Sequence, residues 1–147
     1  MPVRHGIFVN EPVEGARDLV TVATGVIGLV ATADDADADL FPLDQPALIT
    51  DVRSAISQAG ETGTLANALA AIADQASPII VVARVDETVD PADQDDAVIG
   101  TIAGGAYSGV QALLAAEVQK GVRPRILGAP GLHTGAVAAA MGAAAQK

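Results

Sequence analysis

The 147-residue sequence contains no cysteine and no tryptophan, two phenylalanines, one tyrosine and two histidines. Without cysteine the chain can form neither disulfides nor thiolate metal ligands. So few aromatic rings leave little surface on which nucleic-acid bases could stack. Basic residues are also scarce, and the formal net charge of −10 repels phosphate backbones and anionic membrane surfaces. We therefore expect neither a nucleic-acid partner nor a membrane partner.

The sequence lacks a typical secretory leader and a typical membrane span. The apolar run Leu19–Ala33 ends in Ala-Thr-Ala, which resembles a signal-peptidase site. Its flank carries Glu11, Glu14 and Asp18, whereas a secretory leader begins with a positively charged region. A run of this length, interrupted by threonines and a glycine, is also too short and too polar to cross a bilayer. We expect a soluble protein, and the absence of cysteine is compatible with a reducing cytoplasm.

Apolar runs typical of buried strands alternate with segments of helical periodicity. Val26–Ala31 and Ile79–Val85 are almost continuously apolar, as in strands covered on both faces. Shorter strands are predicted at Ala47–Thr50 and within Arg125–Gly131. The hydrophobic residues, 50% of the chain, are mostly small aliphatic ones, which suit closely spaced layers. The pattern predicts an α/β fold with a mainly parallel sheet flanked by helices.

Five helices are predicted from capping residues and apolar stripes. The expected N-caps are Asp51, Thr64, Asp90 and Ser108, and the last helix is expected to be an alanine-rich one over Thr134–Gln146. Pro91 suits a first turn, Gln111 would complete a capping box with Ser108, and Lys120 with Gly121 suits a helix end. The predicted inner faces are Leu65, Leu69, Ile72 and Ala76; Val98, Ile99 and Ile102; Val110, Leu113, Leu114 and Val118; and Val137, Met141 and Ala144.

The first twenty residues differ from the rest. Gly6–Val9 has extended character, and Pro12 and Gly15 interrupt any regular element. We predict an extended N-terminal arm or linker in residues 1–20 and an α/β domain in residues 21–147.

An acidic segment directly follows the first predicted strand. Asp35, Asp37 and Asp39 form a D-x-D-x-D pattern that resembles the start of a calcium-binding loop. That loop requires glycine at its sixth position and glutamate at its twelfth, where this chain has Leu40 and Pro46. We favour a solvated loop, with a weak cation site as an alternative.

A second alternative for the aspartates is phosphoacceptor chemistry. Asp34 and Asp35 follow one predicted strand and Asp86 follows another, as in receiver domains. Such a site also needs a lysine after a later strand, and none follows Arg125–Gly131. We therefore favour loop aspartates over this interpretation.

Other candidate catalytic groups are isolated. The segment Gly104–Gly109 fits neither a dinucleotide motif nor a Walker A motif, and Ser108 is not in a G-x-S-x-G context. His5 lies in the predicted arm and His133 near the last helix, without obvious partners. The residues predict no catalytic site, no metal site, no cofactor and a non-enzymatic role.

Charge is distributed unevenly along the chain. Before residue 99 there are 17 acidic and four basic residues, whereas after Glu117 only basic residues occur. Lys120, Arg123 and Arg125 therefore form a possible inter-subunit electrostatic patch, which could meet acidic loops of a neighbouring copy. A lysine near a helix C-terminus also has a local explanation in the helix dipole.

Four segments together resemble the tail sheath proteins of contractile phages and R-type pyocins. They are RHGIFVNE, VIGLVATADDADADLFPLDQPALITDV, TGTLANALAAIADQASPIIVVARV and YSGVQALLAAEVQKGVRPRILGAPGL. The apolar strand followed by the acidic loop and FPLDQPALIT is the most specific part. The segments occur in the order expected for the N-terminal portion of a sheath protein.

The resemblance implies a subunit that polymerises as stacked rings around a tail tube and contracts to drive the tube through the host envelope. It implies a virion protein, assembled in the bacterial cytoplasm, whose partners are other sheath subunits. Sheath proteins of this family are longer, so the resemblance also implies a fragment whose contacts with tube and baseplate lie in other regions.

The resemblance further implies that the arm adds a strand to a neighbouring subunit, a form of β-augmentation. The implied contact residues are Val3, Gly6, Ile7, Phe8, Val9 and Val13, with Ile7 and Val9 on one face and Phe8 on the other. The alternative function is a small flavodoxin-like or receiver-like domain that binds a ligand at its strand ends. A plain interaction module derived from a sheath ancestor is a third possibility.

Overall fold

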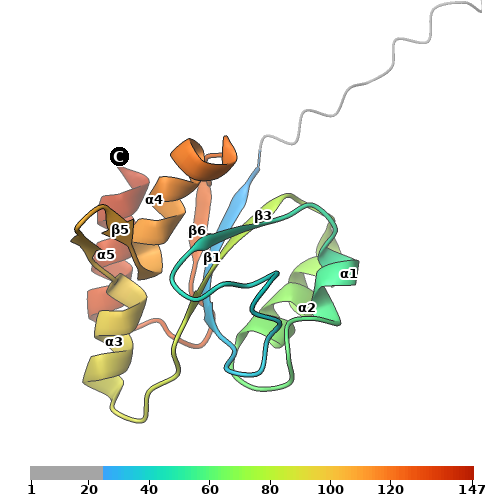
Figure 1. Ribbon diagram of the computed structural model, residues 1–147, viewed down its shortest axis with the longest axis horizontal. Helices are drawn as coiled ribbons and strands as arrows, with labels where there is room; N and C mark the ends of the chain where they lie inside the picture. Colours follow the sequence, from blue (N-terminus) through green and yellow to red (C-terminus); the bar gives the residue numbers. More distant parts are fainter. Residues whose placement is uncertain (1–24) are drawn as a thin grey trace, which may run out of the picture.

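A four-stranded mixed sheet lies at the centre of the structure, a computed structural model that describes residues 25–147 (Figure 1). The sheet order is β2-β3-β1-β6. The strands are β1 (Ile27–Thr32), β2 (Pro46–Ile49), β3 (Ile80–Val85) and β6 (Ile126–Gly128). β1 is parallel to β3 and β6, and β2 is antiparallel to β3. The predicted α/β class with a mainly parallel sheet is confirmed, and the predicted arm lies outside the described residues.

Helices cover both faces of this sheet (Figure 1). Helices α1 (Val52–Ile56) and α2 (Leu65–Gln75) pack on one face. Helices α3 (Pro91–Ile99), α4 (Gly109–Lys120) and α5 (Gly135–Ala145) pack on the other. A small hairpin, β4 (Ile102–Ala103) and β5 (Ala106–Tyr107), connects α3 with α4.

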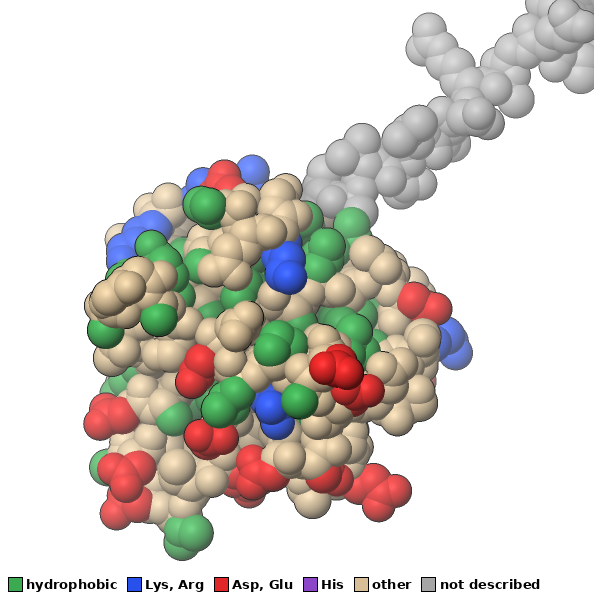
Figure 2. All heavy atoms as spheres, in the orientation of Figure 1, with side chains coloured by type: hydrophobic (Ala, Val, Ile, Leu, Met, Phe, Trp, Pro, Cys, Tyr) green, Lys and Arg blue, Asp and Glu red, His purple; other side chains and the backbone are tan. Residues whose placement is uncertain are grey.

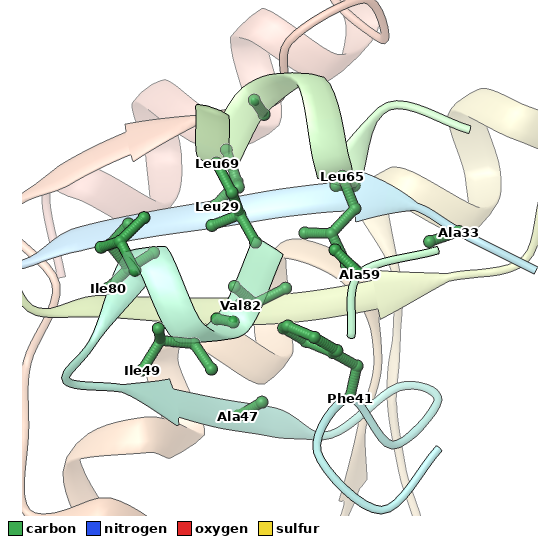
Figure 3. Close-up of a cluster of buried hydrophobic side chains, with 14 of the residues drawn as sticks. Leu29, Ala33, Phe41, Ala47, Ile49, Ala59, Leu65, Leu69, Ile80 and Val82 are labelled. Atoms are coloured by element: carbon green, nitrogen blue, oxygen red, sulfur yellow. The ribbon is translucent and has the colours of Figure 1, made fainter. Parts of the chain in front are cut away.

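The strands are apolar at consecutive positions because alternate side chains enter two different cores. On β1, Leu29 and Ala31 face the core under α1 and α2, and Val30 faces the core under α3, α4 and α5. Figure 3 shows the first of these cores, where Phe41, Leu65 and Leu69 pack over Leu29 and Val82. Phe41 is completely buried, although it follows the acidic loop.

Several predicted caps occur in the structure. The carboxylate of Asp51 accepts hydrogen bonds from the amides of Arg53 and Ser54, and that of Asp90 accepts from Ala92. The last helix, for which the sequence predicted no cap, is capped by Thr134, whose hydroxyl accepts a hydrogen bond from the amide of Val137. Gly121 ends α4 in the left-handed conformation, with φ 69°.

Thr64 and Ser108 occupy the predicted N-cap positions of α2 and α4, but neither side chain makes a capping bond, because both hydroxyls bond elsewhere. Thr64 precedes α2 but accepts from the amide of Thr32 in β1, and Ser108 precedes α4 but accepts from the amide of Thr101. The capping box of Ser108 and Gln111 is therefore absent.

The predicted inner faces are too long at their ends. Ala76 is exposed beyond the end of α2, Ile102 is 54% exposed in β4, and Val118 is 90% exposed on α4. Ala76 and Ile102 lie beyond the ends of α2 and α3, and Val118 lies in the last turn of α4, whose residues are all exposed.

Candidate assembly surfaces

The loops that follow β1 and β3 form one end of the domain. Because the two strands are parallel, their carboxyl ends meet at the same edge of the sheet. We call residues 34–39 and 86–96, which contain ten acidic and no basic residues, the acidic end. Figure 2 shows acidic side chains over the lower part of the molecule, below the basic ones at its upper left.

Asp35 connects the loop after β1 to the turn before α2. Its carboxylate accepts hydrogen bonds from the amides of Glu61 (2.8 Å) and Thr62 (3.1 Å) and from the hydroxyl of Thr62. The hydroxyl bond is the largest of the effects that lower the pKa of Asp35 to about 2, and the two amide bonds add to it. The residue is therefore ionised and used for loop structure.

Asp34, another candidate for phosphoacceptor chemistry, and Asp37 of the D-x-D-x-D pattern also bond to nearby backbone. Asp34 accepts from the amide of Glu87 at 3.4 Å, which ties the loops after β1 and β3 together. Asp37 accepts from the amide of Asp39 at 2.9 Å. Within residues 25–147, no group of three or more histidine, cysteine or acidic side chains could hold a metal ion.

Arg84 lies between the acidic end and the edge of the sheet at β2. Its guanidinium donates to the carbonyl of Ala33 at 2.9 Å, and its own carbonyl accepts from the amide of Asp44 at 2.9 Å. Burial raises the pKa of Asp44 above its usual value, the amide of Gly109 lowers it, and nearby Asp86 raises it. These contacts join the segment before β2 to β3 and to the start of α4.

The opposite end of the domain is basic. Lys120, Arg123 and Arg125 are all exposed around the connection between α4 and β6. Arg123 forms a long ion pair with Glu117, at 3.9 Å between Nη1 and Oε2. We call the surface of these three cations the basic end.

A groove of about 420 Å³ lies at the basic end. Leu113, Leu114 and Leu127 contribute apolar lining, and Arg123 and Arg125 line it together with the end of α5. We call it the basic groove. It contains apolar surface and cationic groups side by side, a combination that suits an apolar side chain flanked by carboxylates.

A second groove, of about 760 Å³, lies beside β6, at the edge of the sheet. It is lined mainly by small and apolar residues, including Ile27, Ala68, Ile72, Pro78 and Ile126. β6 pairs with β1 on one side only, so its other edge has unpaired backbone groups in the described part of the chain.

The remaining candidates form no catalytic arrangement among the residues that the structure describes. Gly104 and Gly105 form the turn of the β4–β5 hairpin, which the sequence did not predict as strands. The hydroxyl of Ser108 bonds to the backbone of Thr101 across that hairpin. His133 is exposed before α5, and His5 lies outside residues 25–147. No helix in this part of the chain is long and apolar enough to cross a membrane.

Comparison with known proteins identifies the class to which this domain belongs. Residues 24–85, which include β1, β2, α1, α2 and β3, match a family model described as the tail sheath protein Gp18 domain III N-terminal region. The chain therefore contains a domain of tail sheath proteins.

Curated relatives extend this match to almost the whole chain. The tail sheath protein of Escherichia phage P2 is 51% identical over 97% of this chain, and the major tail sheath protein of Serratia phage KSP20 is 48% identical over 92%. A putative prophage major tail sheath protein of Pseudomonas aeruginosa strain UCBPP-PA14 is 36% identical over 97%. The chain belongs to the phage tail sheath protein family.

The matches cover 38%, 35% and 38% of these three relatives, so the chain spans less than two fifths of their length. Tail sheath proteins are structural components of the phage tail, and the resemblance found in the sequence is confirmed.

Proposed function

We propose that this chain forms part of a sheath subunit that polymerises as stacked rings around a tail tube. Contraction of these rings would drive the tube through the host envelope. The observation that carries the proposal is the 51% identity to the phage P2 tail sheath protein over 97% of this chain. The acidic loop would then be a solvated or subunit-facing surface, and the role is non-enzymatic and needs no cofactor.

The proposed partners are other sheath subunits in the virion tail, after assembly in the bacterial cytoplasm. The tail tube and the baseplate would be contacted through regions of the relatives that this chain does not span. The proposed organisation is an arm in residues 1–20 and an assembling domain in residues 21–147.

The arm would link subunits by strand addition. Backbone hydrogen bonds would supply the attachment, while Ile7 and Val9 on one face and Phe8 on the other would set the register. The remaining proposed contacts are Val3, Gly6 and Val13. The unpaired edge of β6 and the apolar groove beside it support a fold whose sheet can be extended by another chain segment.

Co-assembly with a full-length relative tests this function. The chain would be mixed with the phage P2 tail sheath protein during polymerisation, and the polymer would be collected by sedimentation. We expect the chain to enter the polymer, and a variant lacking residues 1–13 to enter less, with unchanged thermal unfolding of the domain. A chain that stays in solution at every mixing ratio would contradict the sheath role.

A ligand screen separates this function from the flavodoxin-like or receiver-like alternative. Any ligand that binds the folded chain raises its thermal stability. A concentration-dependent rise with Mg²⁺, a nucleotide or a flavin would favour the alternative, whereas the proposal predicts no rise.

A further inference from the structure

One loop at the acidic end presents an apolar side chain to solvent. Val89, between β3 and α3, has 103% of its reference surface exposed. Glu87 and Asp90 lie on either side of it in the chain, and both are exposed. An apolar side chain in this setting has no role in the core of its own domain.

The loop that carries Val89 is held in place by side-chain bonds. Gln94 accepts from the amide of Thr88 at 2.9 Å and donates to the carbonyl of Asp86 at 3.1 Å. The hydroxyl of Thr88 donates to the carbonyl of Asp90 at 3.2 Å. Contacts on both sides of Val89 therefore fix its position, which lowers the entropic cost of a contact made by its side chain.

The basic groove lies at the other end of the domain. Val89 follows the carboxyl end of β3, whereas Arg125 precedes the amino end of β6, and β1 is parallel to both strands. Figure 1 accordingly shows the β3–α3 loop at the bottom and the connection between α4 and β6 at the top. The two surfaces cannot meet within one molecule, but they can meet between two.

The two surfaces are complementary in charge and in polarity. The loop combines an apolar tip with two carboxylates, and the groove combines leucine side chains with the guanidinium groups of Arg123 and Arg125. Two acidic ends would repel each other, because the acidic end has no basic residue. Glu117 at the groove is already paired with Arg123.

We propose that Val89 of one copy inserts into the basic groove of the next copy, with Glu87 and Asp90 facing Arg123 and Arg125. Lys120 adds positive charge beside the contact. The contact is head-to-tail, so each copy uses two different surfaces and the association can continue from copy to copy. This inference rests on the proposed sheath function and specifies two surfaces through which copies meet.

Disulfide crosslinking tests the contact in a chain that has no cysteine of its own. Ala145 is exposed and lines the basic groove. The double variant Val89→Cys/Ala145→Cys should form a ladder of dimers, trimers and longer species under mild oxidation. Each single variant should stop at dimers. The matched control Ile102→Cys/Ala145→Cys, with an exposed residue of the β4–β5 hairpin, should form no ladder.

Solution association of the unoxidised chain gives a second measurement, by sedimentation equilibrium. Val89→Ser should raise the dissociation constant about tenfold, because a buried valine side chain loses its apolar contact. Ile102→Ser should leave it unchanged. Salt at about 1 M should also weaken association, since the charges at the rim are then screened.

A charge exchange tests the pairing of the two rims. Glu87→Lys and Arg125→Glu should each weaken self-association about tenfold or less. Mixing the two variants should restore a contact, in which the Glu87→Lys variant supplies the loop and the Arg125→Glu variant supplies the groove. Rescue of this kind requires that the two positions face each other.

The results of these experiments test the proposed contact independently of the proposed sheath function. A chain that remains monomeric at all concentrations, or a ladder that is equally strong with Ile102→Cys, would overturn the contact. If the chain nevertheless co-assembles with the phage P2 protein, the sheath role stands and the contact is wrong. A ladder with rescue but without co-assembly would support the contact and contradict the sheath role.

Discussion

Thr32 and Thr64 exchange two hydrogen bonds across 32 residues of sequence. The amide of Thr64 donates to the carbonyl of Thr32 at 2.9 Å, and the amide of Thr32 donates to the hydroxyl of Thr64 at 3.2 Å. β6 pairs with β1 only along Ile27–Leu29, so Thr32 has no strand partner on that side. Thr64 supplies both bonds that a longer β6 would have made, and it also places the start of α2.

Replacement of Thr64 by valine should remove one of these two bonds. The shape of the side chain is nearly kept, but the amide of Thr32, a residue that is 1% exposed, loses its acceptor. We expect a loss of about 1–2 kcal/mol in the free energy of unfolding, measured by urea denaturation. Thr64→Ser keeps the hydroxyl and serves as the control. Equal losses in both variants would contradict the role of the hydroxyl.

Gly63 makes the approach of Thr64 to Thr32 possible. It has φ 73°, and a Cβ added to it would lie 2.2 Å from the carbonyl oxygen of Thr32. Gly121 has a similar φ of 69°, but a Cβ there would meet nothing within 4 Å. Gly121→Ala should therefore lower the free energy of unfolding only because alanine is unfavourable in the left-handed conformation, by about 1–2 kcal/mol. Gly63→Ala should lower the free energy of unfolding by clearly more in the same denaturation experiment. Equal losses in the two variants would show that the close approach of Gly63 to the carbonyl of Thr32 is unimportant.

The lowered pKa of Asp35 predicts how the stability of the fold changes with pH. Its pKa is lowered from 3.8 to about 2 in the folded chain, chiefly by the hydroxyl of Thr62. A lowered pKa stabilises the fold above the unfolded value, so the contribution is complete above about pH 4 and declines as the pH falls toward 2. The melting temperature of Asp35→Asn should be below that of the parent at pH 7. The difference should shrink between pH 4 and pH 2, and a constant difference would contradict this assignment.

Two residues of α4 test the position of its buried face. Leu113 is 1% exposed and Val118 is 90% exposed, although the sequence predicted both as buried. Leu113→Ala should reduce the free energy of unfolding by about 3 kcal/mol, because it leaves a cavity in the core. Val118→Ala should change it by less than about 0.5 kcal/mol. Chemical denaturation of the two variants measures both values, and a large loss for Val118→Ala would place it at a buried contact.

The central strands could be predicted from the sequence because burial on both faces produces continuous apolar runs. Val26–Ala31 and Ile79–Val85 were each correct to within one residue of β1 and β3. Asp51 and Asp90 were correct caps because an N-cap bond is local in sequence. The family was also correctly predicted from the sequence.

Contacts between distant residues could not be predicted in the same way. Nothing local distinguishes a threonine that caps its own helix from Thr64, whose hydroxyl bonds to β1. The antiparallel direction of β2 and the sheet order depend on packing and not on periodicity. Val89 was not predicted as a contact residue, since a single valine in a loop forms no pattern. A valine between acidic residues, outside every predicted element, was the available signal.

The central position of β1 has a mechanical consequence. β1 is held by β3 along six residue pairs and by β6 along three, all in parallel register. A tensile load that entered the domain at Gly25 would pull β1 along its own axis, between two neighbours. The interstrand bonds would then be loaded together in shear and would not open one after another, so this strand is the part of the domain best suited to transmit force.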